Sequence, residues 1–209
     1  MTDAAAKLTP LGVVVLALLR EGDMHPYEML RLLRQRRKDR VVAISNGTFY
    51  HTVSRLGAAG LLTEVGVDRE GNRPERTTYA LTAQGYDIVA DWVRRELPRI
   101  DRPAQFRVAL TEAHNLPRDE VVDLLTARRE LVAADLAAHR ASLARTHSKE
   151  VPAQFVIDIE RAEAVLAADV AWLDGLLLRL TTREIAWGWS EIPPDTLEKL
   201  RAHREALTT

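Results

Sequence analysis

The sequence predicts an all-α protein with one small β-hairpin. Apolar residues recur every three or four positions through most of the 209 residues, which is the spacing of a buried helix face. The spacing changes once, between Leu61 and Leu81, where β-branched and aromatic residues flank a polar segment with glycine, asparagine and proline. Pro98 and Pro103 mark a further division. We therefore expect one domain over residues 1–99 and a second over residues 100–209.

The composition excludes some classes of site and leaves others open. The chain has no cysteine, so it contains neither disulfides nor thiolate metal sites. A hydrophobic share of 46% and a charged share of 28% are typical of a soluble globular protein. The net charge is only −1, yet residues 31–40 contain six basic residues and one acid. That run is either a weak signal for an anionic partner or an ordinary solvated helix end.

The N-terminal sequence MTDAAAK lacks the basic and apolar regions of a secretory signal peptide. The longest apolar run, over residues 11–19, is too short to span a bilayer. We expect a cytoplasmic protein with no membrane partner.

Three short helices are expected before the hairpin. Thr9 and Pro10 begin the first, because a hydroxyl cap followed by proline favours a helix start, and it stops near residues 21–23. The second begins at residues 25–28 and ends in the basic run. A stub strand is expected over residues 41–44. The third helix follows over residues 45–60, and its apolar residues fall on one side.

The hairpin and the helix after it complete a recognisable layout. We expect strands over residues 61–67 and 75–81, joined by a polar loop over residues 68–74. A further helix begins after Thr82 and runs to about Leu97. Three helices followed by a hairpin form a winged helix-turn-helix, in which the third helix enters the DNA major groove. The hairpin is the wing.

Several motifs occur in register over the first half of the chain. They are Leu8-Thr-Pro-Leu-Gly12, His25-Pro-Tyr-Glu28, Gly47-Thr-Phe-Tyr50, Arg55-Leu56, Gly60-Leu-Leu62, Arg73-Pro74 and Tyr79-Ala-Leu-Thr-Ala-Gln-Gly85. This order resembles the PadR family of bacterial transcription regulators. One departure is Pro26, where that family often has glycine. The resemblance implies a winged helix that binds operator DNA in the cytoplasm, close to the nucleoid.

Long helices are expected in the second half. A short helix over residues 105–115 is followed by a long one over residues 118–147. A second long helix begins at Pro152 and is stopped by Pro193-Pro194, and a last helix covers residues 195–207. The second long helix carries apolar positions at alternating spacings of three and four, as in a coiled coil. These positions are Phe155, Ile159, Ala162, Leu166, Leu173, Leu176 and Leu180, with the polar Asp169 at the remaining position of the series.

Two long helices joined by a short loop form an antiparallel hairpin. Their apolar faces exceed what one hairpin buries, so a partner hairpin is expected. The resemblance implies the same, since PadR-like proteins with this longer second half are homodimers. A two-fold dimer presents its recognition helices roughly 34–36 Å apart, which favours a pseudo-palindromic operator.

The third helix and its surroundings supply the expected DNA contacts. Base edges would be read by its early residues, and phosphates or the minor groove would be bound by residues around it and on the wing. The base-reading set is Thr48, Tyr50 and His51, helped by Ser45 and Asn46; the backbone-binding set is Tyr27, Arg55, Arg69, Arg73 and Arg76. Three alternatives remain. Tyr50 and His51 could be partly buried, the Tyr27 ring could pack on the core, and Arg55 could pair with an acid.

Four tryptophans are the only sign of a small-molecule site. Trp92, Trp172, Trp187 and Trp189 could stack a flat aromatic or apolar effector, and some PadR-like proteins bind such molecules. We favour the alternative, in which they fill gaps between long helices.

No enzymatic constellation is apparent. His139 and His147 are eight residues apart, whereas two imidazoles on one helix share a metal at i, i+4. We expect no metal, no cofactor and no catalytic activity. The expected function is that of a dimeric repressor, released when a signal changes the angle between its winged helices. A winged helix that docks another protein, without a DNA target, is the alternative, and an α-helical enzyme is a distant third.

Overall fold

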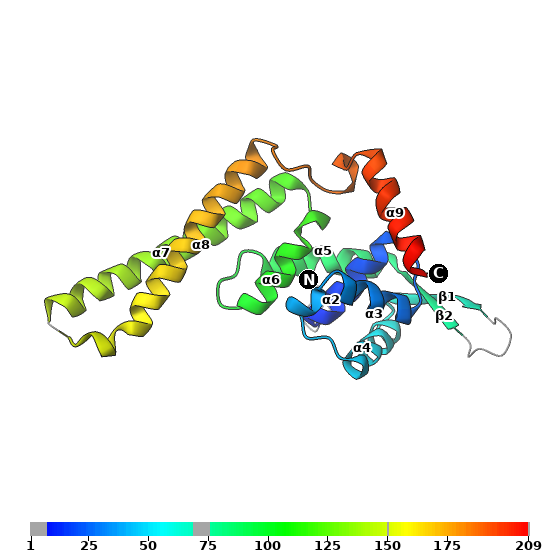
Figure 1. Cartoon of the computed structure of the whole chain (residues 1–209), viewed down its shortest axis with the longest axis horizontal. Helices are drawn as coiled ribbons and strands as arrows, with labels where there is room; N and C mark the ends of the chain where they lie inside the picture. The colour runs from blue at the N-terminus through cyan, green and yellow to red at the C-terminus, as the bar shows by residue number, and fades with distance from the viewer. Residues whose placement is uncertain (1–7, 69–75, 150, 209) are drawn as a thin grey trace.

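The computed structural model describes residues 8–68, 76–149 and 151–208. A body built from the N-terminal helices and the β-hairpin carries a long helical hairpin that projects away from it (Figure 1). The C-terminal helix then returns to the body (Figure 1). The predicted class, all-α with one small β-hairpin and a winged helix-turn-helix at the N-terminus, is confirmed.

The three helices of the helix-turn-helix lie close to where the sequence places them. They are α2 (Pro10–Leu18), α3 (Pro26–Gln35) and α4 (Asn46–Ala58). Thr9 caps α2 by accepting a hydrogen bond from the N–H of Gly12, at 3.2 Å. A short 3-10 turn, η1 (Leu19–Glu21), tightens the end of α2.

The predicted stub strand over residues 41–44 is wrong. This segment follows the 3-10 turn η2 (Lys38–Arg40), and the N–H groups of Val41 and Val42 both donate to the carbonyl of Lys38. The local turn therefore outweighs the extended preference of the β-branched residues. A strand-like bridge occurs elsewhere, because Met24 exchanges two backbone hydrogen bonds of 3.0 Å with Tyr79. This bridge fixes the wing to the start of α3.

The wing consists of β1 (Leu62–Asp68) and β2 (Arg76–Leu81), which pair antiparallel. The register runs from Leu62 opposite Leu81 to Asp68 opposite Arg76 and is shifted between Glu64 and Gly66. A bulge of this kind increases the local twist of a hairpin. The wing thus leaves the body as a twisted ribbon.

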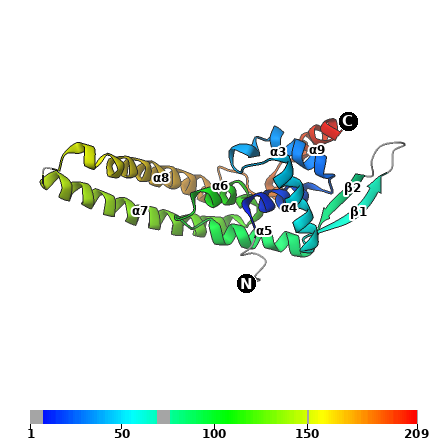
Figure 2. The same cartoon turned by 90° about the horizontal axis from the view of Figure 1, so that it is seen from below.

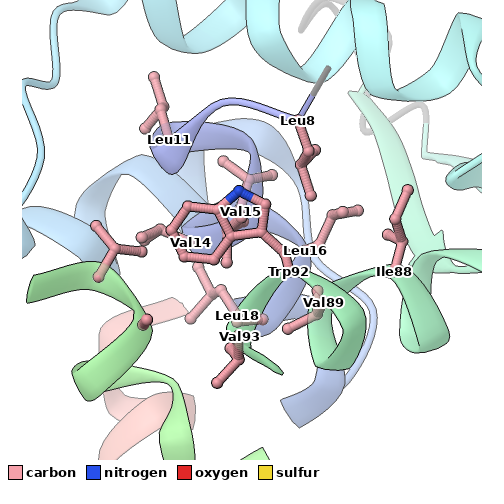
Figure 3. Close-up of a cluster of buried hydrophobic side chains, with 14 of the residues drawn as sticks. Leu8, Leu11, Val14, Val15, Leu16, Leu18, Ile88, Val89, Trp92 and Val93 are labelled. Carbon is pink, nitrogen blue, oxygen red and sulfur yellow. The ribbon is translucent and has the colours of Figure 1, made fainter. Parts of the chain in front are cut away.

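The core is organised around α2 and Trp92. All residues of α2 from Leu11 to Leu18 are buried, so the helix is covered on every side. Trp92 lies on α5 (Ala83–Glu96) and is 1% exposed. Its ring lies among the α2 residues Val14, Val15 and Leu18 (Figure 3). The helix that follows the wing is therefore packed against the first helix of the chain.

The same core continues past the expected division at Pro98 and Pro103. It includes residues of α6 (Pro103–Thr111), of the 3-10 turn η3 (Ala113–Asn115) and of the start of α7 (Arg118–Ser148). Phe106, Val108 and Val121 are among them. The break between α5 and α6 is thus a sharp bend, and the helices on its two sides share one apolar cluster.

Helices α7 and α8 (Ile157–Thr181) form the long antiparallel hairpin (Figure 2). The predicted seam faces α7 from Ile159 to Leu180, and Leu173 and Leu180 are fully buried. Phe155 is an exception, because it lies in the 3-10 turn η4 (Ala153–Phe155) and is 65% exposed. Val156 is buried in its place.

The end of α8 also differs from the prediction. The helix ends at Thr181, well before Pro193 and Pro194, and Arg183 adopts a left-handed φ of 58°. The N–H of Glu184 bonds to the carbonyl of Arg179, which closes the helix end. After the turn η5 (Trp189–Glu191), α9 (Pro194–Thr208) lies against the body (Figure 1). No helix of the described residues is long and apolar enough to cross a membrane.

The junction between the wing and α5 has no room for a larger side chain. Thr82 caps α5 by accepting from the N–H of Gly85 at 3.0 Å, and its hydroxyl donates toward the carbonyls of Gly60 and Leu61. A Cβ added to Gly85 would lie 2.3 Å from the backbone oxygen of Leu61. The wing and α5 are therefore fixed together through Gly85.

Gly85→Ala should lower the free energy of unfolding by about 1–3 kcal/mol, the usual cost of forcing extra volume into a packed site. Chemical denaturation followed by circular dichroism measures this change. Gly57→Ala is the matched control, because a Cβ at this helical position meets no atom within 4 Å. The control should be neutral or slightly stabilising. Equal effects of the two substitutions would contradict the packing.

Candidate nucleic-acid interface

Helix α4 has one buried and one exposed side. Phe49, Thr52, Val53 and Leu56 are buried against the body. The opposite side is open to solvent and carries amide, hydroxyl, phenol, imidazole and guanidinium groups. These exposed residues are Asn46, Thr48, Tyr50, His51, Ser54 and Arg55. The polar side predicted from the sequence is therefore free to meet a partner.

The start of α4 is held by a capping box. Ser45 accepts from the N–H of Thr48 at 3.2 Å, and the Thr48 hydroxyl oxygen accepts from the N–H of Ser45 at 3.1 Å. The two hydroxyls also lie 2.8 Å apart. Both side chains therefore fix the helix start before any ligand arrives. This cap would therefore determine where the Ser45 and Thr48 side chains lie on DNA.

Asn46 and Gly47 form the exposed tip of α4. Asn46 Oδ1 accepts a hydrogen bond from Arg34 Nη2 at 2.5 Å, which links α4 to the end of α3. A Cβ added to Gly47 would meet no atom within 4 Å, so the backbone there is open. The free N–H groups and positive dipole end of a helix favour an approaching phosphate.

Tyr50 and His51 point away from the core. Tyr50 is 45% exposed, and its ring meets that of Phe49 edge-on, with the ring centroids 5.5 Å apart. His51 is exposed as well. Both side chains are therefore accessible to a partner, although about half of Tyr50 is also covered. An edge contact to a buried ring limits the motion of Tyr50 without covering its hydroxyl.

Tyr27 and Arg55 flank this surface. Tyr27 is 63% exposed at the start of α3, so its ring does not pack on the core. His25 caps α3 by accepting from the N–H of Tyr27 through Nδ1, at 3.1 Å. Arg55 is exposed, and none of the described residues forms an ion pair with it. Both are accessible, and their contact with phosphates stays a prediction.

The wing arginines are less fully described. Arg69 and Arg73 lie outside the described residues. Arg76 begins β2 opposite Asp68 in the register, which places its backbone at the outer end of the wing. Their proposed contact with the minor groove stays a prediction.

Sequence reasoning missed one part of this surface. Tyr27, Arg31 and Arg34 are all exposed on α3 at spacings of four and three, so they share one face of that helix. The hydrogen bond from Arg34 to Asn46 joins this face to the tip of α4. The spacing contained the signal, but the sequence left the basic run open between an anionic partner and a solvated helix end. We call the exposed faces of α3 and α4 together the α3–α4 surface.

Comparison with known proteins agrees with this geometry. Residues 15–91 match the model of the transcriptional regulator PadR-like family. The N-terminal part of the chain is therefore similar to the PadR-like family of transcriptional regulators. The matched segment runs from the middle of α2 through the wing to α5, so it contains the whole α3–α4 surface.

Solved structures of PadR-like proteins are similar at low identity. Bacillus subtilis PadR in complex with operator DNA is 21% identical, and the match covers 81% of this chain and 98% of that one, with a TM-score of 0.39. The same protein in complex with p-coumaric acid is 20% identical, and the match covers 83% of this chain and 99% of that one, with a TM-score of 0.38. A PadR-like transcriptional regulator from Bacillus cereus is 17% identical, and the match covers 83% of this chain and 99% of that one, with a TM-score of 0.35. No curated protein matches the chain.

The four tryptophans do not come together in the structure. Trp92 is in the core, and Trp172 is 44% exposed on α8. Trp187 is half-buried and donates from Nε1 to the carbonyl of Leu116 at 2.9 Å. Trp189 lines a cavity together with residues of the N-terminal body. Trp92 and Trp187 thus have the packing roles favoured above. Within the described part of the chain, no group of three His, Cys, Asp or Glu residues could hold a metal ion.

Ser45→Ala should lower the free energy of unfolding by about 1 kcal/mol, because it removes the N-cap of α4. Urea denaturation measures the loss. Ser54→Ala is the control, since Ser54 is exposed in the middle of the same helix. It should be close to neutral. A control as destabilising as Ser45→Ala would show that the cap has no specific role.

Proposed function

We propose that this PadR-like protein is a dimeric, sequence-specific DNA-binding regulator that represses transcription by occupying its operator and is released by a small-molecule signal. The observation that carries DNA binding is the α3–α4 surface. It joins base-sized polar side chains on α4 to a row of exposed arginines on α3, on a domain of a transcription regulator family.

The geometry supports separate roles for the two helices. The exposed side of α4 enters the major groove, where Tyr50, His51 and Asn46 meet base edges. Arg31, Arg34 and Tyr27 on α3, and Arg55 on α4, face the flanking phosphates. Ser45 and Thr48 set the angle of α4 through the capping box and contact the backbone or bases with their remaining lone pairs.

A dimer is supported by the outward side of α8. It carries exposed apolar residues along nearly its whole length, alternating with small residues that let another helix approach closely. The large residues are Ile157, Val165, Trp172 and Leu178, and the small ones are Ala164, Ala168, Ala171 and Gly175. Spacings of three and four again match helix packing. A second copy would cover this side by two-fold symmetry.

Such a dimer determines the form of the operator. Two copies of α4 related by a two-fold axis read the same sequence on opposite strands. A pseudo-palindromic site is therefore expected, and a dimer that covers it blocks access of RNA polymerase to an overlapping promoter. A signal that changes the relative orientation of the two winged helices would separate α4 from one half-site and relieve repression.

The first test is DNA binding at two salt concentrations. The probe is DNA from upstream of the protein's own gene, with a shuffled fragment of equal length for comparison. Binding should weaken steeply as salt rises, because bound phosphates release counterions. Tyr50→Ala should weaken binding to the upstream DNA by at least fivefold, about 1 kcal/mol, and reduce the preference over shuffled DNA.

Arg55→Ala should act differently. It should weaken binding to both fragments to a similar degree. It should also reduce the slope of log affinity against log salt by about 1, as expected for one lost phosphate contact. Arg145→Ala is the control, because Arg145 is exposed near the end of α7 that lies far from the body (Figure 1). Salt-independent binding, or wild-type affinity in both α4 variants, would indicate a winged helix that docks another protein.

The second test concerns the dimer. Ala168→Glu introduces a charge at the middle of the outward side of α8, where burial without a partner is costly. The dimer dissociation constant should rise at least about tenfold, corresponding to 1.4 kcal/mol. Sedimentation velocity at several concentrations measures it. Ala83→Glu is the matched control on α5, at an exposed helix start that tolerates an acid. An unchanged dimer in Ala168→Glu would place the interface elsewhere.

A further inference from the structure

The basic run at the end of α3 divides into two groups in the structure. Two of its six members are paired with carboxylates of the body, Arg36 with Glu21 and Lys38 with Glu112. The other four are exposed to solvent: Arg31, Arg34, Arg37 and Arg40. A run that is uniform in the sequence therefore contains side chains in different surroundings, and they do not all serve one purpose.

The ion pair between Lys38 and Glu112 joins residues that are 74 positions apart in the chain. Lys38 Nζ donates to Glu112 Oε1 at 2.8 Å, and the two side chains are 22% and 5% exposed. Thr111 and Asn115 add donors at 3.3 and 3.4 Å from the two carboxylate oxygens. A buried carboxylate is costly unless a positive charge is held beside it. Glu112 therefore holds the Lys38 side chain turned toward the body.

The backbone of Lys38 organises the connection from α3 to α4. Its carbonyl accepts hydrogen bonds from the N–H groups of Val41 and Val42, at 2.9 and 3.0 Å. Both valines are partly buried against the core, and the cap of α4 at Ser45 follows. A residue that is fixed by its side chain and also holds the turn by its carbonyl restricts where α4 begins.

A strained residue lies directly before Lys38. Arg37 has a φ of 52° and a ψ of 34°, in the left-handed region that residues other than glycine rarely occupy. Such a conformation costs free energy and persists only where the surrounding structure holds it. Here it is held between the end of α3 and the Lys38–Glu112 pair. Without the pair, the connection would be free to relax to another conformation.

We infer that Lys38 is a positioning residue for DNA binding. With Glu112 as its anchor, it holds the connection that places α4, and it contacts no phosphate itself. This role rests on the proposed function of the α3–α4 surface. Glu112 lies between α6 and η3, so the pair also makes the position of α4 depend on the helices that follow the winged helix.

Charge and position predict different effects of removing the two residues. By charge alone, loss of the Glu112 carboxylate would strengthen binding to a polyanion, and loss of Lys38 would weaken it. A positioning role predicts that both losses weaken binding, because each removes the same contact. It also predicts an unchanged salt dependence without Lys38, since the number of bound phosphates stays the same.

The test measures binding of the full chain to the upstream DNA at two salt concentrations. Lys38→Gln and Glu112→Gln should each weaken binding at least about fivefold, with the slope of log affinity against log salt unchanged. Lys38→Arg keeps a cationic donor for Glu112 and should recover most of the lost affinity. Asp39→Asn is the matched control, because it removes an exposed carboxylate from the neighbouring position. Its binding should be unchanged or tighter.

A second measurement needs no DNA. In Lys38→Gln and Glu112→Gln, the amides of Val41 and Val42 should lose protection against hydrogen exchange, because the turn around the Lys38 carbonyl opens more often. Protection should stay at the wild-type level in Asp39→Asn and be largely kept in Lys38→Arg. Thermal melts establish that each variant is folded.

Binding of Glu112→Gln as tight as that of the wild type, or tighter, would overturn the inference. A salt slope reduced by about 1 in Lys38→Gln would overturn it as well, because that result indicates a direct phosphate contact. Unchanged amide protection in both variants would have the same meaning. Failure of the wild type to bind DNA would instead contradict the proposed function, and hydrogen exchange would still show whether the pair holds the connection.

Discussion

The complete burial of α2 is the constraint on which the rest of the structure depends. A helix that is apolar on every side must be covered on every side, and here the covering helices include α4, α5 and α6. Trp92 brings α5 against α2 and fills the space between them (Figure 3). Each covering helix places its buried side inward, so its polar side must face solvent. The exposed face of α4 is a consequence of this packing.

Polar contacts then join the C-terminal helices to that core. Arg118, at the start of α7, is buried, donates to the carbonyls of Leu180 and Ile185 and pairs with Glu191. Arg128 is also buried and stacks on Phe106, with its guanidinium carbon 3.4 Å from the ring centre. Burial lowers the pKa of Arg128, and the charge of Asp169 on α8 opposes that shift.

These buried contacts restrict how the α7–α8 hairpin is oriented relative to the body. Buried charged groups are costly unless their partners are held in place, so they favour one arrangement of the hairpin relative to the body. In the proposed dimer, a rigid connection would let a change near η3 and η5 alter the spacing of two α4 helices. The Lys38–Glu112 pair lies on this connection.

The sequence by itself determined the order and kind of elements. The signals for these elements are local in the chain, and in a folded protein local preferences agree with the global structure. They are the periodic apolar residues, the caps Thr9, Ser45 and Thr82, and the single change of period at the wing. They placed α4 and its polar face correctly. Only the tertiary structure decided which residues meet across elements. It formed a bridge between Met24 and Tyr79, where the sequence predicted none, and joined Arg34 to Asn46. These pairings join residues distant in the chain, and no periodicity encodes them.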